Sequence, residues 1–398
     1  MNSSVENGRV HVVDALRGIA IAGIVMIHFI EHLNFYVFPE PSGPLMAKID
    51  AAVWDTIFFL LAGKMYAIFS LLFGFSFFIQ FSNAAKKGID FSRRFLWRMT
   101  LLFLLGLIDL CFYNGDILCV YAVCGVLIIP CFKARDKVLL SLMILFFLQP
   151  IELVYIFLGL ADPSVQPLDL GANGLFGALV PVQAEGGLSD VAEAGLRYGL
   201  GINFTWAIEH GRLTQTICLF LTGLYLGRKN FFRNSEGNEK IWNKTLWLGL
   251  AGFAVFCPLY FLLPDMIENR CVKSSVTIML DMWKNFSMMS VIVSSVLLLY
   301  YKSGLFNKAL NRITPYGKMS LTNYLGQSIF GSLFFYNWGF GWYEHLGHTS
   351  SLLLGIVFIF CQYLFCVWWL KTHQRGPVEE LWSRGTKITT LRPASGKI

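Results

Sequence analysis

Apolar residues run in long blocks along most of the chain, and short polar or Gly/Pro-rich stretches separate the blocks. Each block has about 20 residues, the length that a helix needs to cross a bilayer core of about 30 Å. The blocks are continuously apolar and do not alternate residue by residue, which disfavours a β-barrel. The pattern therefore predicts an all-α, polytopic membrane helix bundle of about ten transmembrane helices. The predicted spans are residues 14–36, 56–82, 95–113, 115–132, 138–160, 211–232, 244–264, 275–301, 316–337 and 350–370.

The basic residues give these spans an orientation. Most of the 32 Lys and Arg fall in the connections on one side of the predicted bundle, and the positive-inside rule assigns that side to the cytoplasm. We therefore expect both termini in the cytoplasm and a multi-pass protein of a bacterial cytoplasmic (inner) membrane. Arg9 and Arg17 precede the first apolar core without a following cleavage site, which predicts an uncleaved first span instead of a signal peptide.

The pattern predicts one membrane domain over residues 1–398, with an outer loop at 161–210 and a cytoplasmic tail at 371–398. The loop is rich in acidic residues and contains a short amphipathic pattern near residues 188–200. Two interpretations of it stay open. It is either an ordinary acidic surface loop or a cap over an outward-facing cavity.

Composition supports the membrane class and excludes others. Hydrophobic residues make up 55% of the chain and charged residues 14%, whereas soluble domains have roughly 25% charged residues. A soluble enzyme and a disordered chain are excluded. The formal charge of +7 is read as an orientation signal, so we expect no nucleic-acid partner. The nine Cys show no CxxC or Cys/His spacing, so no metal site is predicted.

The first span carries the densest set of ionisable residues. On a helix with 100° per residue, Asp14, Arg17, His28, Glu31 and His32 share an arc of about 100°. Ionisable residues within spans are costly, so each is a functional candidate. His28, with Glu31 beside it, has the chemistry of a general base for a hydroxyl or amine, and Asp14 and His32 would be auxiliary. The alternative is that the two His residues are interfacial or form a structural hydrogen-bond pair.

Other charged residues within the predicted spans are weighed in the same way. Lys64 is predicted to hold an anionic phosphate or carboxylate, or else to begin a shorter span that follows an interfacial helix at 46–62. Asp281 and Lys284 form an i, i+3 pair that is as consistent with packing as with a site. Asp116 follows an Asn-Gly turn and is a natural N-cap. Asp109 lies nearly one turn deeper, so it is the better catalytic candidate.

The ninth predicted span opens with many hydrogen-bonding side chains. Lys318, Asn323 and Gln327 are its main polar residues. They would bind a polar ligand from the cytoplasmic side, or Asn323 and Gln327 would join helices by hydrogen bonds. The chain has no nucleotide-binding glycine loop, GxSxG elbow, HExxH motif or haem-ligand pattern.

Several motifs carry a family resemblance. Residues 317–328, GKMSLTNYLGQS, resemble the GRMALTNYLLQS signature of the YeiB-like bacterial integral-membrane family, a domain-of-unknown-function family. Five other stretches agree in order: DALRGIAIAGI (14–24), GKMYAIFSLLFG (63–74), LLGLIDLCFYNGDILCVYA (104–122), LTGLYLGR (221–228) and RGPVEELW (375–382). The family usually has His at the position of Asp109, Asn near His28 and Arg at Lys318. We therefore hypothesise that Asp109 and His28 have exchanged roles.

The first-span pattern also resembles that of two acyl-transferring membrane families, the bacterial O-acyltransferases of surface glycans and heparan-alpha-glucosaminide N-acetyltransferase. This resemblance implies an acyltransferase that moves an acyl group from cytosolic acyl-coenzyme A (acyl-CoA) to an extracytoplasmic or membrane-embedded acceptor, a glycan or small molecule. No permanently bound cofactor is implied. His28 with Glu31 or Asp109 would be catalytic, Lys64 would lie along the acyl path, and the coenzyme A phosphates would meet Arg17, Arg94, Arg98 and Lys318.

Two other function classes stay open. The same polar stripe would suit a transporter or exporter of a small polar or anionic molecule, as a proton relay and substrate site. The sequence lacks an evident inverted repeat, which weighs mildly against transport. A structural or regulatory membrane protein without chemistry is the third reading, because family membership alone does not establish an activity.

Overall fold

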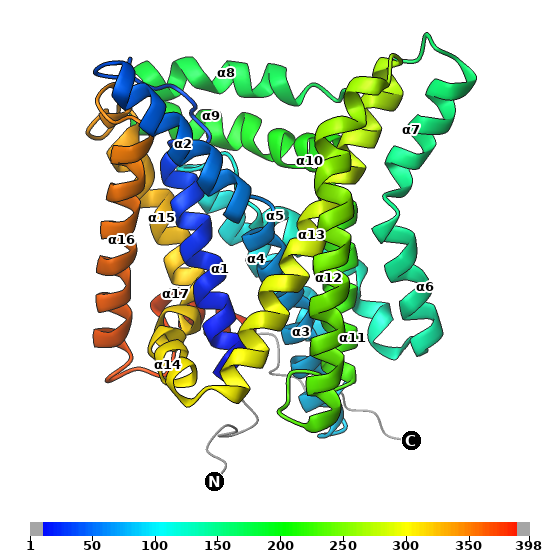
Figure 1. The fold of residues 1–398 in the computed structure, drawn as a ribbon. Helices are drawn as coiled ribbons and strands as arrows, with labels where there is room; N and C mark the ends of the chain where they lie inside the picture. Colours follow the sequence, from blue (N-terminus) through cyan, green and yellow to red (C-terminus); the bar gives the residue numbers. More distant parts are fainter. Residues whose placement is uncertain (1–10, 388–398) are drawn as a thin grey trace.

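The structure, a computed structural model, describes residues 11–387; Arg9 and the end of the predicted tail lie outside these residues. The described residues form helices and turns, with no strand among them. Most helices run side by side in one bundle (Figure 1). We call the end where α1 begins the inner end and the opposite end the outer end, after the predicted orientation. The first helices are α1 (His11–Ile30), α2 (Pro44–Leu61), α3 (Lys64–Ala85), α4 (Ser92–Leu110) and α5 (Leu118–Leu127).

The apolar helices have the lengths of a membrane bundle. Among the described residues, five stretches are long and apolar enough to cross a bilayer, or six if the bent pair α6–α7 forms one span. The five are His11–Ile30, Pro44–Ala85, Glu236–Met266, Arg270–Lys302 and His348–Trp369. The all-α class is thus confirmed for the described residues, and these helices are compatible with a membrane bundle, whereas ten spans and cytoplasmic termini stay predictions.

Several predicted spans are broken in the structure. The first ends at Ile30 and not at residue 36, because His32, Leu33, Asn34 and Tyr36 adopt left-handed backbone angles with φ between 51° and 62°. The second breaks at Gly63, whose φ of 75° ends the α2 segment. Lys64 is therefore the first residue of α3, where the alternative interpretation began a shorter span. The interfacial position of the helix before it stays a prediction.

The middle spans break at prolines and at one strained glutamine. The predicted span 115–132 is α5 followed by a 3₁₀ turn, η1 (Ile129–Lys133), with Pro130 in its first turn. The predicted span 138–160 is two helices, α6 (Asp136–Phe147) and α7 (Pro150–Ala161), which meet at 48° around Gln149 with φ 54°. Proline at the start of η1 and α7 cannot continue the preceding helix.

The segment predicted as an outer loop is mostly helical. It contains α8 (Ala172–Glu185), α9 (Leu188–Ala194), the π-helical turn η2 (Gly195–Gly199) and α10 (Leu200–Glu209). In Figure 1, α8 and α10 run across the upper end of the bundle, transverse to the upright helices. This segment therefore covers the outer end of the bundle.

The second half of the chain completes the bundle with two long helices and a group of shorter ones. Amphipathic α14 and α17 were not predicted, because reading apolar blocks does not detect helices with one polar face. The bounds are α11 (Arg212–Arg228), α12 (Glu236–Leu262), η3 (Pro264–Met266), α13 (Arg270–Lys302), α14 (Gly304–Lys318), α15 (Ser320–Phe335), η4 (Trp342–Glu344), α16 (His348–Trp369) and α17 (Pro377–Lys387).

Glycines allow the closest helix contacts. A Cβ atom on Gly223 of α11 would lie 1.9 Å from the backbone oxygen of Leu71 in α3, and one on Gly74 would lie 2.0 Å from that of Phe220. A Cβ on Gly317 would lie 1.8 Å from the backbone oxygen of Asp14. Small residues are what membrane helices use to approach this closely. These contacts fix α3 beside α11 and α14 beside α1.

Candidate functional site

A cavity of about 550 Å³ lies at the outer end of the bundle. The end of α1, the α2–α3 junction and the turn before α5 line it, and α8 and α10 close it from the outer side. Its polar lining residues are His28, Glu31, Asn34, Tyr36, Tyr66, Tyr113, Asp116, Asn173, Asn203, His210, Arg212 and Tyr324. We call it the outer cavity.

His28 and Tyr113 form the central polar contact of the outer cavity. The Tyr113 hydroxyl lies 3.1 Å from His28 Nε2, and the two ring centroids are 4.8 Å apart. His28 Nδ1 is buried and has no hydrogen-bond partner among the described residues. His28 therefore faces Tyr113, another residue that lines the cavity, with Nε2 and not with Nδ1.

Glu31 and His32 separate where α1 ends. Glu31 continues the helical hydrogen bonding and lines the cavity, where its Oε2 accepts a 2.9 Å hydrogen bond from the Tyr36 hydroxyl. His32 turns away: its ring nitrogens lie 2.9 Å from the Val37 carbonyl and 2.8 Å from the Ser351 hydroxyl. The expected single polar arc is therefore wrong for His32, because the helix has already ended there.

Asp109 and Asp116 are buried neighbours with different surroundings. Asp116 lines the outer cavity and accepts hydrogen bonds from the backbone N–H groups of Leu118 (3.0 Å) and Cys119 (3.2 Å), so it caps the start of α5. Asp109 accepts a 3.0 Å hydrogen bond from Ser328 and is not among the residues that line the cavity. The structure therefore brings His28, Glu31 and Asp116 to one cavity and keeps Asp109 behind its wall.

A second cavity, of about 230 Å³, lies toward the inner end. Arg17, Lys318 and Glu379 are its charged lining residues, and we call it the inner cavity. Arg17 pairs with Asp14 at 2.8 Å and also hydrogen-bonds Ser76. Two of the predicted phosphate-binding residues, Arg17 and Lys318, thus line the same cavity.

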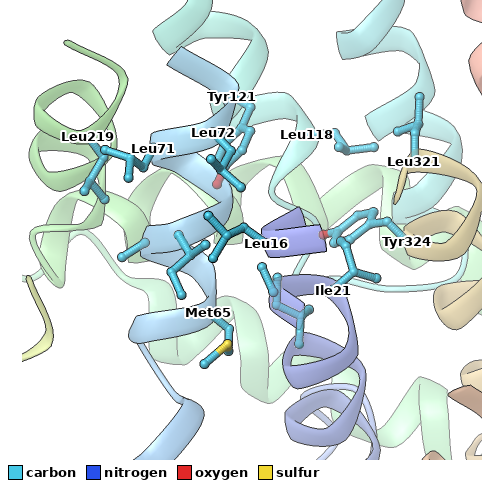
Figure 2. Close-up of a cluster of buried hydrophobic side chains, with 14 of the residues drawn as sticks. Leu16, Ile21, Met65, Leu71, Leu72, Leu118, Tyr121, Leu219, Leu321 and Tyr324 are labelled. Atoms are coloured by element: carbon cyan, nitrogen blue, oxygen red, sulfur yellow. The ribbon is translucent and has the colours of Figure 1, made fainter. Parts of the chain in front are cut away.

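A thin layer of side chains separates the two cavities. Ile117 lines the outer cavity and its neighbour Leu118 lines the inner one. On α15, Tyr324 lines the outer cavity and Leu321, one turn earlier, lines the inner one. The Ile117 N–H donates a 3.1 Å hydrogen bond to the Tyr324 hydroxyl on the outer-cavity side of this layer. Figure 2 shows Leu118, Leu321 and Tyr324 in one buried cluster with Tyr121 and side chains of α1.

Arg94 and Arg98 are not among the residues that line the inner cavity. The Arg98 guanidinium lies 3.9 Å from the Trp382 ring centroid, and its Nη1 is 3.4 Å from the Thr386 hydroxyl. Arg94 lies 5.7 Å from the Phe91 ring. The structure therefore uses Arg98 to dock α17 against α4.

Glu379 joins α17 to the start of α15. Its Oε1 accepts hydrogen bonds from the backbone N–H groups of Leu321 (2.8 Å) and Thr322 (3.1 Å), and its Oε2 accepts one from the Thr322 hydroxyl at 2.5 Å. Burial raises the pKa of Glu379, although these hydrogen bonds act in the opposite direction. This contact ties the 375–382 motif to the 317–328 motif.

Asn323 and Gln327 lie inside the helix packing. The side-chain amide of Asn323 donates to the backbone carbonyl of Tyr316 at 3.0 Å, and the backbone carbonyl of Asn323 accepts from the Gln362 side chain at 2.9 Å. Gln327 is fully buried, and neither of its amide atoms has a partner among the described residues. Neither residue is among those lining the two cavities, so Asn323 joins helices here.

Lys64, Asp281 and Lys284 belong to a charged cluster at the outer end. Asp281 pairs with Lys284 at 3.0 Å and with Arg212 at 3.6 Å. Lys64 lies within electrostatic range of all three. Arg212 also lines the outer cavity, so the cluster and the cavity adjoin.

The sequence reading predicted three of the twelve polar lining residues, His28, Glu31 and Asp116, and missed nine, among them Tyr36, Tyr113 and Arg212. The two tyrosines were missed because their aromatic rings are counted as hydrophobic, so they do not stand out as polar residues in an apolar block. Tyr113 lies in the 104–122 motif, which was the available signal. Arg212 stands directly after Gly211 at the start of an apolar block and was read only as a flanking charge.

Known proteins from two bacteria match nearly the whole chain. A family model described as "Protein of unknown function (DUF418)" matches residues 226–389. The chain is 26% identical to YxaH of Bacillus subtilis (strain 168), over 98% of this chain and 97% of that protein. It is also 26% identical to YeiB of Escherichia coli (strain K12), over 97% of each. The chain is similar to proteins of the YeiB-like family.

A second family model matches the N-terminal part of the chain. It is described as the catalytic part of heparan-alpha-glucosaminide N-acetyltransferase and covers residues 9–166. His28, Tyr113 and Asp116 fall within that match, whereas Lys318 and Glu379 fall within the DUF418 match. The N-terminal part of the chain is therefore similar to an acetyltransferase catalytic model. Among the described residues, no group of His, Cys, Asp and Glu is arranged to hold a metal ion.

Proposed function

We propose that this protein is an acyltransferase of a bacterial cytoplasmic membrane. It would take an acyl group from cytosolic acyl-CoA and deliver it to an acceptor in the outer cavity. The donor would enter through the inner cavity, where Arg17 and Lys318 attract the phosphates of coenzyme A. The acyl-pantetheine arm would then pass the layer formed by Leu118 and Tyr324. No bound cofactor is needed, because acyl-CoA is a co-substrate.

In the proposed reaction, His28 acts as a general base. It takes the proton from the acceptor's hydroxyl or amine as that group attacks the thioester carbonyl carbon. A bond forms between the acceptor and the acyl carbon, the C–S bond breaks, and the proton is passed to the departing coenzyme A sulfur. Tyr113, bonded to His28 Nε2, would orient the ring and shift as the acceptor arrives.

One observation carries this proposal. A histidine with a directed Nε2 lines one cavity, two basic residues line a second, and a single layer of side chains lies between them. A donor and an acceptor that approach from opposite sides of a membrane need this arrangement. The similarity of residues 9–166 to an acetyltransferase catalytic model supports the same reaction class.

The test is a transfer assay with the purified protein in lipid nanodiscs. Acetyl-CoA is added, and the free thiol of released coenzyme A is measured with and without a glycan acceptor extract. His28→Gln keeps a polar side chain near Tyr113 but cannot take up the proton, so we expect a loss of about 10²–10⁴-fold in rate. His345→Ala, in an exposed turn, is the matched histidine control.

Release that is equal in wild type and His28→Gln would overturn the assignment of His28. No thioester cleavage at all, combined with His28-dependent uptake of a small anion into proteoliposomes, would replace the enzyme by the transporter.

A further inference from the structure

We propose that the outer ends of α3 and α11 bind a phosphate monoester, held by Lys64 and Arg212 with Lys284 beside them. Arg212, which lines the outer cavity, connects the site to that cavity. The anion site itself does not depend on the acyltransferase activity. Its role as the subsite for a phosphorylated acceptor rests on the proposed function.

The charges in this cluster do not balance. Lys64, Arg212 and Lys284 are cations, and Asp281 is the carboxylate that faces them. Asp281 is already engaged by Lys284, Arg212 and an Asn285 hydrogen bond of 2.9 Å. Two positive charges are therefore left without a counter-charge among the described residues. Such an excess is costly in a low-dielectric region unless an anion joins it.

Lys64 is the clearest unpaired group. It is only 3% exposed, and its ammonium has no hydrogen bond or ion pair with any described residue. Its nearest aromatic contact is the Phe59 ring, with the centroid 5.6 Å away. A buried ammonium loses hydration, and a ring contact at this distance replaces only a small part of it. A ligand oxygen would supply the missing hydrogen bonds.

The helix ends at this place add to the positive potential. Lys64 and Arg212 are the first residues of α3 and α11, which pack together through Gly74 and Gly223. Each follows a left-handed glycine, Gly63 with φ 75° and Gly211 with φ 63°. Both helices therefore begin at the same end, and two helix N-termini with their free N–H groups favour an anion there.

The outer cavity gives a ligand access to this cluster. Arg212 lines it and so does Gly63, which directly precedes Lys64. Arg212 Nε is buried and has no partner among the described residues.

The carboxylates of the outer cavity are bound elsewhere. Glu31 is bonded to Tyr36 and Asp116 to the start of α5. Glu209, at the end of α10, accepts from the N–H groups of Leu170 and Ala172. None of these three carboxylates forms an ion pair with Lys64, Arg212 or Lys284 in the described part of the chain, where Asp281 is the paired carboxylate.

The charge defines the ligand class. A phosphate monoester carries a charge of about −1.5 to −2 at neutral pH and three strong acceptor oxygens. It would balance the two excess charges and accept from Lys64 and from Arg212. Two sources share this chemistry: the headgroup of an anionic lipid and a soluble phosphorylated compound.

Thermal unfolding of the purified protein tests the site without using acyl transfer. Two probes separate the sources: inorganic phosphate added to protein in phosphatidylcholine nanodiscs, and nanodiscs that also contain phosphatidic acid. Sodium chloride at equal ionic strength is the salt control. Lys64→Met removes the charge and keeps the apolar stem, whereas Lys48→Gln removes one exposed outer charge away from the cluster.

We expect at least one probe to raise the melting temperature of wild type and of Lys48→Gln, as binding to the folded state must. Lys64→Met should bind the same probe at least about tenfold more weakly. Without a probe it should melt at the same or a higher temperature than wild type, because cation repulsion is relieved. His28→Gln should respond like wild type, which separates this site from the proposed reaction.

An equal response of wild type and Lys64→Met to both probes would overturn the site, as would no response of wild type to either. A response to phosphatidic acid alone assigns the site to a lipid headgroup. A response to inorganic phosphate assigns it to a soluble phosphoester.

Discussion

The Tyr113 hydroxyl and His28 Nε2 lie 3.1 Å apart, although 85 residues separate them in the chain. Tyr113 reaches this position because its backbone N–H still bonds the Asp109 carbonyl at 2.8 Å as α4 ends. The turn that follows then carries Asp116 into the same cavity. The end of α4 therefore sets the position of the tyrosine that orients the proposed base.

Tyr113→Phe is expected to lower the rate of coenzyme A release by about tenfold, the value of one hydrogen bond to a group that becomes charged. The ring contact with His28 is kept, so the fold should not change. The loss should be smaller than that of His28→Gln, because the base itself remains. Steady-state rates of thiol release measure it. An unchanged rate would show that the hydroxyl does not orient His28.

Lys318 offers a clean test of the inner cavity as the donor site. Lys318 lines this cavity. Arg17 lines it too, but it is bonded to Asp14 and Ser76, so a substitution of Arg17 would also remove those two contacts. For Lys318→Gln we expect a higher KM for acetyl-CoA, by about three- to tenfold, with kcat unchanged, because one phosphate contact is removed. The difference from wild type should shrink in high salt. Lys308→Gln, at an exposed position of α14, serves as control.

The docking of α17 should depend on pH through Glu379. Because burial raises the pKa of Glu379, the docked state binds the proton more tightly than the undocked state. Docking is then strongest below the usual glutamate pKa and weakens as the pH rises through the raised value. Protease cleavage of α17 across this range measures the effect. Glu379→Gln should remove the pH dependence, and Glu379→Ala should weaken docking at every pH.

The sequence predicted the helical class and part of the site for a simple physical reason. Apolar blocks of bilayer length stand out, and so do the rare ionisable residues within them, such as His28, Glu31 and Lys64. The breaks in the helices were harder to predict. Gln149, with φ 54°, and His32, with φ 51°, adopt left-handed angles that only tertiary contacts impose.

The cavities could not be derived from the sequence either. They depend on which helices are neighbours, and α14 beside α1 and α3 beside α11 are pairings of segments far apart in the chain. Arg212 becomes a site residue only through such a pairing. Asp109 shows the reverse, since a carboxylate in a predicted span is held by Ser328 behind the cavity wall.

The α3–α11 contact also predicts a stability effect at Gly223. A Cβ there would lie 1.9 Å from the Leu71 backbone oxygen, which cannot rotate away as a side chain would. Gly223→Ala must therefore push the two helices apart, and overpacking of this kind costs about 1–3 kcal/mol. Gly237→Ala, on an exposed part of α12 with no atom near the new Cβ, should be neutral or slightly stabilising. Thermal unfolding in one detergent compares the two variants. Because Lys64 and Arg212 begin these helices, Gly223→Ala should also weaken phosphate binding, whereas equal melting of both variants would show that the helices are not in this close contact.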